Sequence, residues 1–253
     1  MTTEILYGRN PVLESLRANR RQFHQLQLAQ GMETDERLDQ LLEMAQERRI
    51  PVQRLARDHF KEYPGNAQGV ALVTSPYPYS ELDHMLAMAE ARDEPPWILL
   101  LDVLKDPQNV ATLLRTAEAV GVHGVIIPLR RSASITPVVV SASSGASEHL
   151  LIGRSNLAQT IEQLKAHDVW ITGLEGSDQS QPLAEADLTG AMGLVIGSEG
   201  AGLRRLVRDS CDFLVRLPMR GKVESLNAAA AGAVALYFVL AARGFPAPPK
   251  DGK

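Results

Sequence analysis

Three short stretches of the sequence place polar side chains directly after apolar runs, where a folded chain could use them for chemistry. The middle stretch combines three glycines with Glu199. Glycine allows tight turns and close approach of the backbone, so this loop could hold a ligand through N–H groups and admit an adenosyl group. Its G-x-x-G-x-G order matches neither the dinucleotide fingerprint nor the P-loop. The three stretches are KDPQN (105–109) with Arg115 beyond it, GSEGAGL (197–203) and LPMRGKVESLN (217–227).

Each stretch also has a purely structural interpretation. Asn109 could cap the helix that follows it, and Ser225 or Asn227 could cap the last helix. The glycines could form a plain turn. The alanines after Asn227, together with Gly232, indicate a thin helix that another segment could approach closely. On the residues alone, a ligand pocket and ordinary loop–helix junctions both stay open.

Other kinds of chemistry find little support in the sequence. The six histidines lie far apart, without the spacing of metal ligands, so we expect no bound metal. The single cysteine, Cys211, precludes an internal disulfide. No G-x-S-x-G nucleophile motif is present.

The elements that must position these stretches follow an α/β pattern from Trp97 onward. Continuous apolar runs such as WILLLDVL are typical of buried parallel strands. Because strands alternate with helices, we predict a mostly parallel sheet covered on both faces, with ligands beyond the carboxyl ends of its strands. The predicted strands lie within 97–104, 124–128, 169–176, 193–200 and 213–219, and the predicted helices within 109–122, 157–168 and 225–243, with another after Pro137.

The first 75 residues read as a smaller α/β unit, with Asn10 as the cap of its first helix and Pro11 at the first helical position. An amphipathic helix is predicted at 35–49, and strands at 22–30, 50–56 and 69–75. We therefore predict a small domain at 1–76, an acidic linker at 77–95 that includes a helix around 81–91, and a large domain at 96–247.

Charge and hydropathy limit the remaining classes of protein. The net charge is −4, and the whole excess lies in 76–95, so global charge does not predict nucleic-acid binding. The uncharged run 228–242 is too short to span a bilayer comfortably and is interpreted as a buried helix. The N-terminal residues lack a signal-peptide pattern, so a cytoplasmic location and no membrane partner are expected.

Taken in order, the three stretches resemble the motifs of the SpoU (TrmH-type) family of RNA ribose 2′-O-methyltransferases, within the SPOUT superfamily. The likeness covers about residues 97–243, and SASSGASEHL (141–150) resembles the serine-rich stretch between the family's first and second motifs. The segments ILYGRNPVLESLRA (5–18) and AQGVALV (67–73) resemble the small L30e-like substrate-binding domain of several members. Two positions depart from the family pattern, since Ala111 stands where glycine is common and Ser141 where lysine is frequent.

This resemblance implies a deep trefoil knot, a homodimer that packs the last helix against its partner, and S-adenosyl-L-methionine as cofactor. Arg115 matches the arginine proposed to activate the ribose hydroxyl, but guanidinium stays protonated, so a phosphate contact that orients the hydroxyl is the safer role. The catalytic set implied is Arg115, Asn109, Glu199, Ser225 and Asn227. The cofactor-binding set implied is Gly197, Leu217, Leu226, Gly173, Leu174 and Met219.

The two-domain layout resembles bacterial members that modify guanosine in 23S ribosomal RNA, and the sequence has no basic tail of the kind carried by transfer-RNA members. We therefore expect ribosomal RNA as partner, with Arg9, Asn10, Arg20 and Arg21 as its contacts in the small domain. The alternatives are a transfer-RNA 2′-O-methyltransferase and a non-catalytic RNA-binding protein on the same fold. A nucleotide-dependent enzyme of ordinary doubly wound type would need a glycine fingerprint after the first strand of the large domain, and LLDVLKDPQNV has none.

Overall fold

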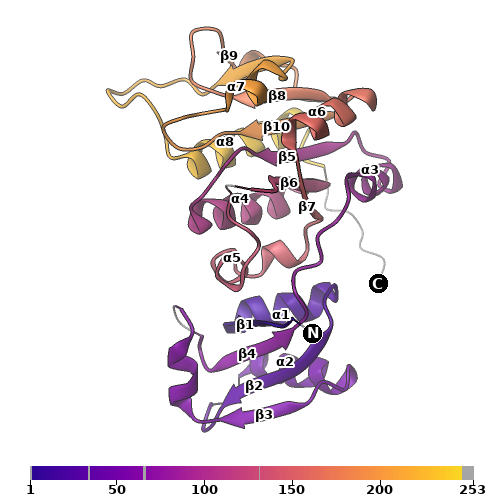
Figure 1. The fold of residues 1–253 in the computed structure, drawn as a ribbon, viewed down its shortest axis with the longest axis vertical. Helices are drawn as coiled ribbons and strands as arrows, with labels where there is room; N and C mark the ends of the chain where they lie inside the picture. Colours follow the sequence, from indigo (N-terminus) through magenta and orange to yellow (C-terminus); the bar gives the residue numbers. More distant parts are fainter. Residues whose placement is uncertain (1, 34, 65–66, 131, 247–253) are drawn as a thin grey trace. The chain divides into compact units, whose positions relative to one another are not determined.

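The computed structural model describes residues 2–33, 35–64, 67–130 and 132–246, which form two compact units (Figure 1). The small unit comprises Met1–Pro78 and Ile135–His149, and the large unit comprises Tyr79–Ser134 and Leu150–Lys253. The chain therefore passes between the units three times. The family resemblance assigned 135–149 to the large domain, whereas these residues pack with the small unit. The predicted domain end at residue 247 lies outside the described residues.

The small unit contains a four-stranded mixed sheet in the order β1-β4-β2-β3. Strand β4 runs antiparallel to β1 and β2, and β3 runs parallel to β2. The sequence pattern predicts every strand of this sheet except the four-residue β1. The elements are β1 (Glu4–Tyr7), α1 (Arg9–Ala18), β2 (Phe23–Ala29), α2 (Glu36–Glu47), β3 (Val52–Leu55), η1 (Arg57–Glu62) and β4 (Val70–Thr74).

The predicted cap of α1 is wrong, because the helix begins before Asn10. Gly8 precedes the helix with φ of 96°, a left-handed value that glycine adopts without strain, and Arg9 is the first helical residue. Asn10 is therefore the second residue of the helix. The predicted amphipathic helix is confirmed as α2, where the side chain of Asp35 accepts a hydrogen bond from the backbone N–H of Leu38 at 2.9 Å.

The serine-rich segment packs against the small unit through α5 (Pro137–Ala142) and η2 (Ala146–Glu148). Gly145 permits this contact, since a Cβ there would lie 2.6 Å from the Cβ of Glu14 on α1. The carboxylate of Glu148, on η2, is buried. It accepts hydrogen bonds from Arg21 at 2.8 and 2.9 Å and from Ser15 at 3.0 Å. A buried charge is tolerated when it is paired and hydrogen-bonded in this way.

The large unit contains a seven-stranded sheet in the order β7-β6-β5-β10-β8-β11-β9, and every pairing in it is parallel. This confirms the predicted α/β class with a mostly parallel sheet. Strand β10 lies between β5 and β8 although it follows both in the chain. The strands are β5 (Trp97–Leu101), β6 (Gly124–Pro128), β7 (Ile152–Ser155), β8 (Trp170–Leu174), β9 (Gln181–Pro182), β10 (Met192–Ile196) and β11 (Phe213–Arg216).

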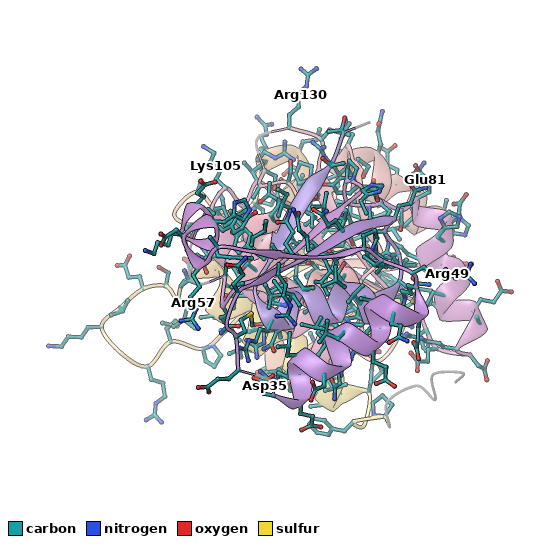
Figure 2. All side chains as sticks on the ribbon, turned by 90° about the horizontal axis from the view of Figure 1, so that it is seen from below. Asp35, Arg49, Arg57, Glu81, Lys105 and Arg130 are labelled. Atoms are coloured by element: carbon teal, nitrogen blue, oxygen red, sulfur yellow. The ribbon has the colours of Figure 1, made fainter. Side chains whose placement is uncertain are left out.

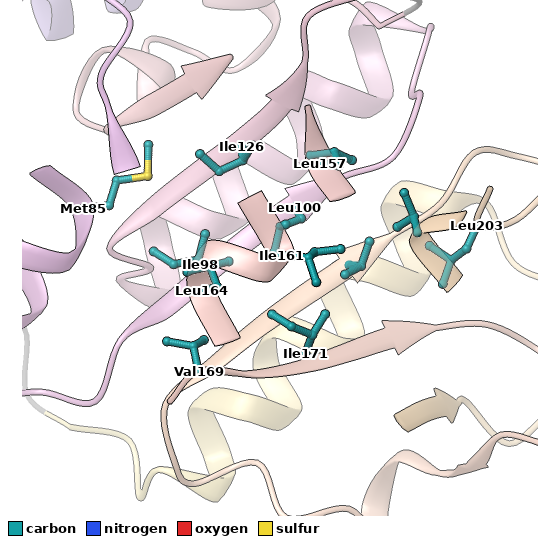
Figure 3. Packing of buried hydrophobic residues seen from close by; sticks show 12 residues of the cluster. Met85, Ile98, Leu100, Ile126, Leu157, Ile161, Leu164, Val169, Ile171 and Leu203 are labelled. Atoms are coloured by element: carbon teal, nitrogen blue, oxygen red, sulfur yellow. The ribbon is translucent and has the colours of Figure 1, made fainter. Parts of the chain in front are cut away.

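Helices cover both faces of this sheet. Side chains of α3 (Leu82–Ala91), α6 (Leu157–Ala166) and α7 (Arg205–Asp209) form one core with the strands, as Figure 3 shows for Ile161, Leu164 and Ile171. On the other face, α4 (Pro107–Val120) packs against α8 (Ala228–Ala242). The short η3 (Leu183–Glu185) follows β9.

Gly232 brings α8 close to the sheet. A Cβ at this position would lie 2.4 Å from Cδ1 of Ile196 on β10 and 2.6 Å from Cδ2 of Leu113 on α4. The small residues at the start of α8 therefore serve close packing, as the sequence indicated. The knot itself stays a prediction.

Within the described ranges, no helix combines the length and the apolar character needed to cross a membrane. The same ranges contain no group of three or more His, Cys, Asp and Glu residues that could hold a metal ion.

Candidate functional site

A cavity of about 630 Å³ opens at the carboxyl ends of β8, β10 and β11 in the large unit. This is the edge at which open parallel sheets bind ligands. Its volume lies within the usual range of small-molecule sites. The lining comes from the ends of these strands, from Arg208 on α7 and from the segment leading into α8, and comprises 174–176, 196–203, 208, 216–217, 219, 224–228 and 231.

The glycine loop after β10 forms a closed turn beside this cavity. Ser198 and Gly202 exchange two backbone hydrogen bonds of 3.0 Å. Gly200 and Gly202 have φ of 75° and 63°, which favours glycine at both positions. A Cβ at Gly197 would lie 2.4 Å from the carbonyl carbon of Gly202, so a larger residue would force the turn open.

Asp102 anchors the far end of this loop and is not among the residues predicted to form the site. Its carboxylate is fully buried and accepts hydrogen bonds from the backbone N–H of Arg204 at 2.8 Å and from Nε of Arg204 at 2.6 Å. The available signal was a lone carboxylate at the end of the apolar run LLLDVL. The next residue, Val103, has φ of 59°, which strains a β-branched side chain at the edge of the site.

One polar side chain from each of the three sequence stretches meets the other two at this site. The side-chain amide of Asn109 donates to Oε1 of Glu199 at 2.6 Å. The amide of Asn227 donates to Oδ1 of Asn109 at 3.1 Å and to the same oxygen of Glu199. We call Asn109, Glu199 and Asn227 the amide–carboxylate cluster. It joins residues 90 and 118 positions apart in the chain.

The capping predictions at this site have opposite outcomes. Asn227 does cap α8, because its Oδ1 accepts hydrogen bonds from the backbone N–H groups of Ala229 at 2.9 Å and Ala230 at 3.2 Å. Asn109 does not cap α4. Asp106 takes that role through the N–H of Gln108, and the buried Asn109 lies in the first turn with its side chain directed to Glu199.

The residues predicted to bind the cofactor lie at the cavity with one exception. Gly197, Leu217, Leu226, Leu174 and Met219 all line it, and so does Ser225 from the predicted catalytic set. Gly173 does not, because a Cβ there would lie 2.7 Å from the side chains of Leu203 and Leu214, within the core. Arg115 is exposed on α4 and lies outside the cavity lining.

The cavity lining contains two further charged residues, Glu175 and Arg208, that the sequence did not indicate as ligand-binding residues. Glu175 follows β8, and its Oε1 forms an ion pair of 3.2 Å with Nε of Arg208.

Close by, burial raises the pKa of the Cys211 thiol to about 12, so this cysteine is not a nucleophile at neutral pH.

The predicted RNA contacts of the small unit need one correction. The side chain of Arg21 is fully buried between Glu148 and Glu4, so it cannot offer its guanidinium to a phosphate. Arg20 is partly buried and donates to the hydroxyl of Tyr77 at 3.2 Å. Arg9 forms an ion pair with Asp35, and Asn10 is exposed. Nothing in the local sequence distinguishes the buried Arg21 from its neighbour Arg20.

Comparison with protein families gives two matches that together span most of the chain. Residues 96–237 match the SpoU rRNA Methylase family. Residues 5–80 match the family described as RNA 2′-O ribose methyltransferase substrate binding.

Two similar bacterial proteins are named as TrmH family tRNA/rRNA methyltransferases. YacO of Bacillus subtilis is 39% identical over 238 residues, which cover 93% of this chain and 94% of that protein. A protein of Staphylococcus saprophyticus is 42% identical over 212 residues, which cover 82% of this chain and 84% of that protein.

Solved structures show the same fold. The SpoU methyltransferase AviRb from Streptomyces viridochromogenes, in complex with AdoMet, superposes with a TM-score of 0.81 at 24% identity and covers 96% of this chain and 92% of that one. An AdoMet-bound rRNA methyltransferase from Sinorhizobium meliloti superposes with a TM-score of 0.77 at 23% identity and covers 94% and 87%.

Proposed function

Because this chain belongs to the SpoU rRNA methylase family, we propose that it methylates the ribose 2′-oxygen of a guanosine in 23S ribosomal RNA. It is an RNA methyltransferase that uses S-adenosyl-L-methionine. The observation that carries the proposal is the meeting of the amide–carboxylate cluster with the glycine loop at one cavity. The names of the two relatives above give tRNA/rRNA without choosing between the two kinds of RNA. The choice of 23S ribosomal RNA is therefore our own addition.

The residues of the cavity fit an adenosyl cofactor. Apolar side chains of Leu174, Leu217 and Leu226 can contact a purine ring, and the backbone of the glycine loop can approach it closely because Gly197 carries no side chain. When bound, S-adenosyl-L-methionine supplies an electrophilic methyl group on a positively charged sulfur.

The chain's own residues would orient the ribose hydroxyl. Asn109 and Asn227 hold the carboxylate of Glu199 through charge-assisted hydrogen bonds, which fixes the mouth of the cavity before any ligand arrives. Ser225 offers a hydroxyl at the same lining. Alignment of the attacking oxygen supplies much of the rate in such a reaction. We assign Arg115 to a phosphate contact, since a planar guanidinium presents its N–H donors in a geometry that matches phosphate oxygens.

Exposed cations near the carboxyl edge of the large sheet can take further phosphates of the RNA. Lys105 and Arg130 extend from the loops after β5 and β6 (Figure 2). In the small unit, Arg9, the exposed Asn10 at the start of α1 and the partly buried Arg20 stay the candidates. Structured RNA is recognised largely through phosphates and shape, which suits scattered cations of this kind.

We also propose that a second copy of the chain covers α8. Val234, Tyr237 and Phe238 are 41%, 50% and 38% exposed and follow one another at helical spacing. An exposed apolar stripe of this kind marks an interface. Light scattering should give twice the monomer mass for the wild type and the monomer mass for Tyr237→Lys. A monomeric wild type would remove the dimer from the proposal.

The function is tested by methyl transfer from radiolabelled S-adenosyl-L-methionine to transcripts of 23S ribosomal RNA and of transfer RNA. We expect label in the 23S transcript at one guanosine, with resistance of the adjoining bond to alkali, because a 2′-O-methyl group blocks cleavage. Arg115→Ala should abolish transfer and leave binding of S-adenosylhomocysteine nearly unchanged.

Each other outcome has a clear meaning. Label in transfer RNA alone would replace the ribosomal substrate with the alternative. Binding of cofactor and RNA without transfer would identify a non-catalytic RNA-binding protein. Removal of residues 1–75 is a poor test of RNA binding, since it would strip Glu148 of its buried partner Arg21, so Arg9→Ala and Asn10→Ala are the better variants.

A further inference from the structure

Glu175 follows β8, the strand that neighbours β10 and its glycine loop. Strands β8 and β10 pair in parallel and end with Leu174 opposite Ile196, so Glu175 and Gly197 are the residues that directly follow this last pair. A carboxylate next to a glycine-rich turn at the carboxyl edge of a parallel sheet is how dinucleotide-binding folds hold the ribose of adenosine. The glycines of this loop follow a different order from those of dinucleotide-binding folds, but a carboxylate beside the loop can accept hydrogen bonds from ribose hydroxyls in the same way.

Glu175 is anchored through its backbone and through one carboxylate oxygen. Its backbone N–H donates to the carbonyl of Val215 at 2.9 Å, and its Oε1 pairs with Nε of Arg208 at 3.2 Å. Arg208 is itself tethered, since its Nη2 donates to the side chain of Gln179 at 3.3 Å. The other carboxylate oxygen, Oε2, lies 3.8 Å from where a Cβ on Gly202 would stand, which places it on the side of the glycine loop.

The other carboxylates of the lining are less suitable for this role. Oε1 of Glu199 already accepts hydrogen bonds from two side-chain amides. Glu224 is exposed on the segment that leads into α8. An ionised carboxylate has about four acceptor positions and no donor, so Glu175 can keep its pair with Arg208 and still accept from two hydroxyls.

We propose that Glu175 accepts hydrogen bonds from the 2′- and 3′-hydroxyls of the adenosyl ribose, and that Arg208 is the positioning residue that orients it. The identity of the ligand rests on the proposed function, whereas the assignment of Glu175 rests on the register of β8 and β10 and on the contacts above. The ligand class is a nucleoside with an intact cis-diol.

Calorimetry on the full-length protein with S-adenosylhomocysteine and its 2′-deoxy and 3′-deoxy analogues tests the proposal without any variant. Loss of a hydrogen bond to a charged group corresponds to roughly 10- to 100-fold in affinity. We expect a loss of that size for each deoxy analogue. A wild-type protein that binds all three ligands equally would overturn the proposal.

The variant Glu175→Ala then assigns the effect to one side chain. It should bind S-adenosylhomocysteine and the deoxy analogues with nearly equal affinity, and Glu185→Ala, an exposed glutamate outside the cavity, should keep the wild-type discrimination. Arg208→Ala should reduce the discrimination, and Arg208→Lys should restore part of it. Discrimination that survives in Glu175→Ala would overturn the assignment, and thermal unfolding checks that each variant is folded.

A third ligand separates the ribose from the amino-acid end of the cofactor. 5′-Methylthioadenosine keeps the diol and lacks the amino acid, so Glu175→Ala should weaken its binding by the same factor as that of S-adenosylhomocysteine. A loss confined to S-adenosylhomocysteine would place Glu175 at the ligand's ammonium group and overturn the proposal. Failure of the wild type to bind any of these ligands would instead count against the proposed function.

Discussion

Asn227 performs two tasks with one side chain, and a single substitution can separate them. Its Oδ1 accepts from two backbone N–H groups at the start of α8, while its Nδ2 donates to Asn109 and Glu199. Asn227→Asp keeps an acceptor for the cap and removes the donor. Asn227→Ala removes both.

The expected magnitudes follow from these contacts. Aspartate caps a helix about as well as asparagine, whereas alanine costs about 0.5–2 kcal/mol. The lost hydrogen bond to a charged group is worth about 1.5–3 kcal/mol. The aspartate also sets a second negative charge against Glu199, which costs roughly 4 kcal/mol at 4 Å with an effective dielectric constant of 20. For Asn227→Asp at pH 8 we therefore expect at least about a tenfold loss of affinity for S-adenosylhomocysteine.

The dependence on pH distinguishes this reasoning from general damage to the site. When the pH falls, one proton can be shared between the two carboxylates, which restores a hydrogen bond in place of the repulsion. Calorimetry at pH 8 and pH 5.5, normalised to the wild type, should show recovery for Asn227→Asp and none for Asn227→Ala. Wild-type affinity of the aspartate variant at pH 8, or the same pH profile in both variants, would refute the role assigned to the amide–carboxylate cluster.

The remaining predictions concern the glycine loop and two buried groups. Gly197→Ala should weaken S-adenosylhomocysteine binding at least about tenfold, because its Cβ would meet backbone atoms at 2.4–2.6 Å; Gly190→Ala, with no neighbour within 4 Å, is its matched control. Glu148→Ala should lower the free energy of unfolding by about 1.5–3 kcal/mol in urea titrations, because it removes the carboxylate bonded to Nε and Nη2 of the buried Arg21 and leaves Glu4 as the remaining ion-pair partner; the exposed Glu47→Ala should change it little. Burial lowers the pKa of His123 below its ordinary 6.5, despite the opposing effect of Glu94, so the unfolded chain binds a proton more readily. Its contribution to stability is complete above about pH 6.5 and declines as the pH falls, and His123→Gln should flatten that decline in urea titrations between pH 8 and pH 5.

The outcomes that contradict these three predictions are equally specific. Equal affinities of Gly197→Ala and Gly190→Ala would show that the turn opens without cost. A small effect of Glu148→Ala would mean that Arg21 reaches water or another acceptor. A pH slope that is unchanged in His123→Gln would assign the acid sensitivity to other groups.

Local pattern in the sequence was sufficient for most of the large unit. Continuous apolar runs identified β5, β6 and β10, which are buried at every position, and shorter apolar runs identified β8 and β11. The glycine loop and the cap by Asn227 were also identifiable, since both depend on the conformations of a few adjacent residues.

Only the tertiary structure decided how the distant pieces meet. Asn109 has the residue type of a helix cap, yet its side chain turns to Glu199, 90 positions away, because β10 lies between β5 and β8 and brings the ends of β5 and β10 together. Arg21 looks like a surface cation beside Arg20, yet Glu148 buries it, because 135–149 pack with the small unit. Backbone preference acts over a few residues, whereas strand order and the pairing of buried charges are set by the packing of the whole chain.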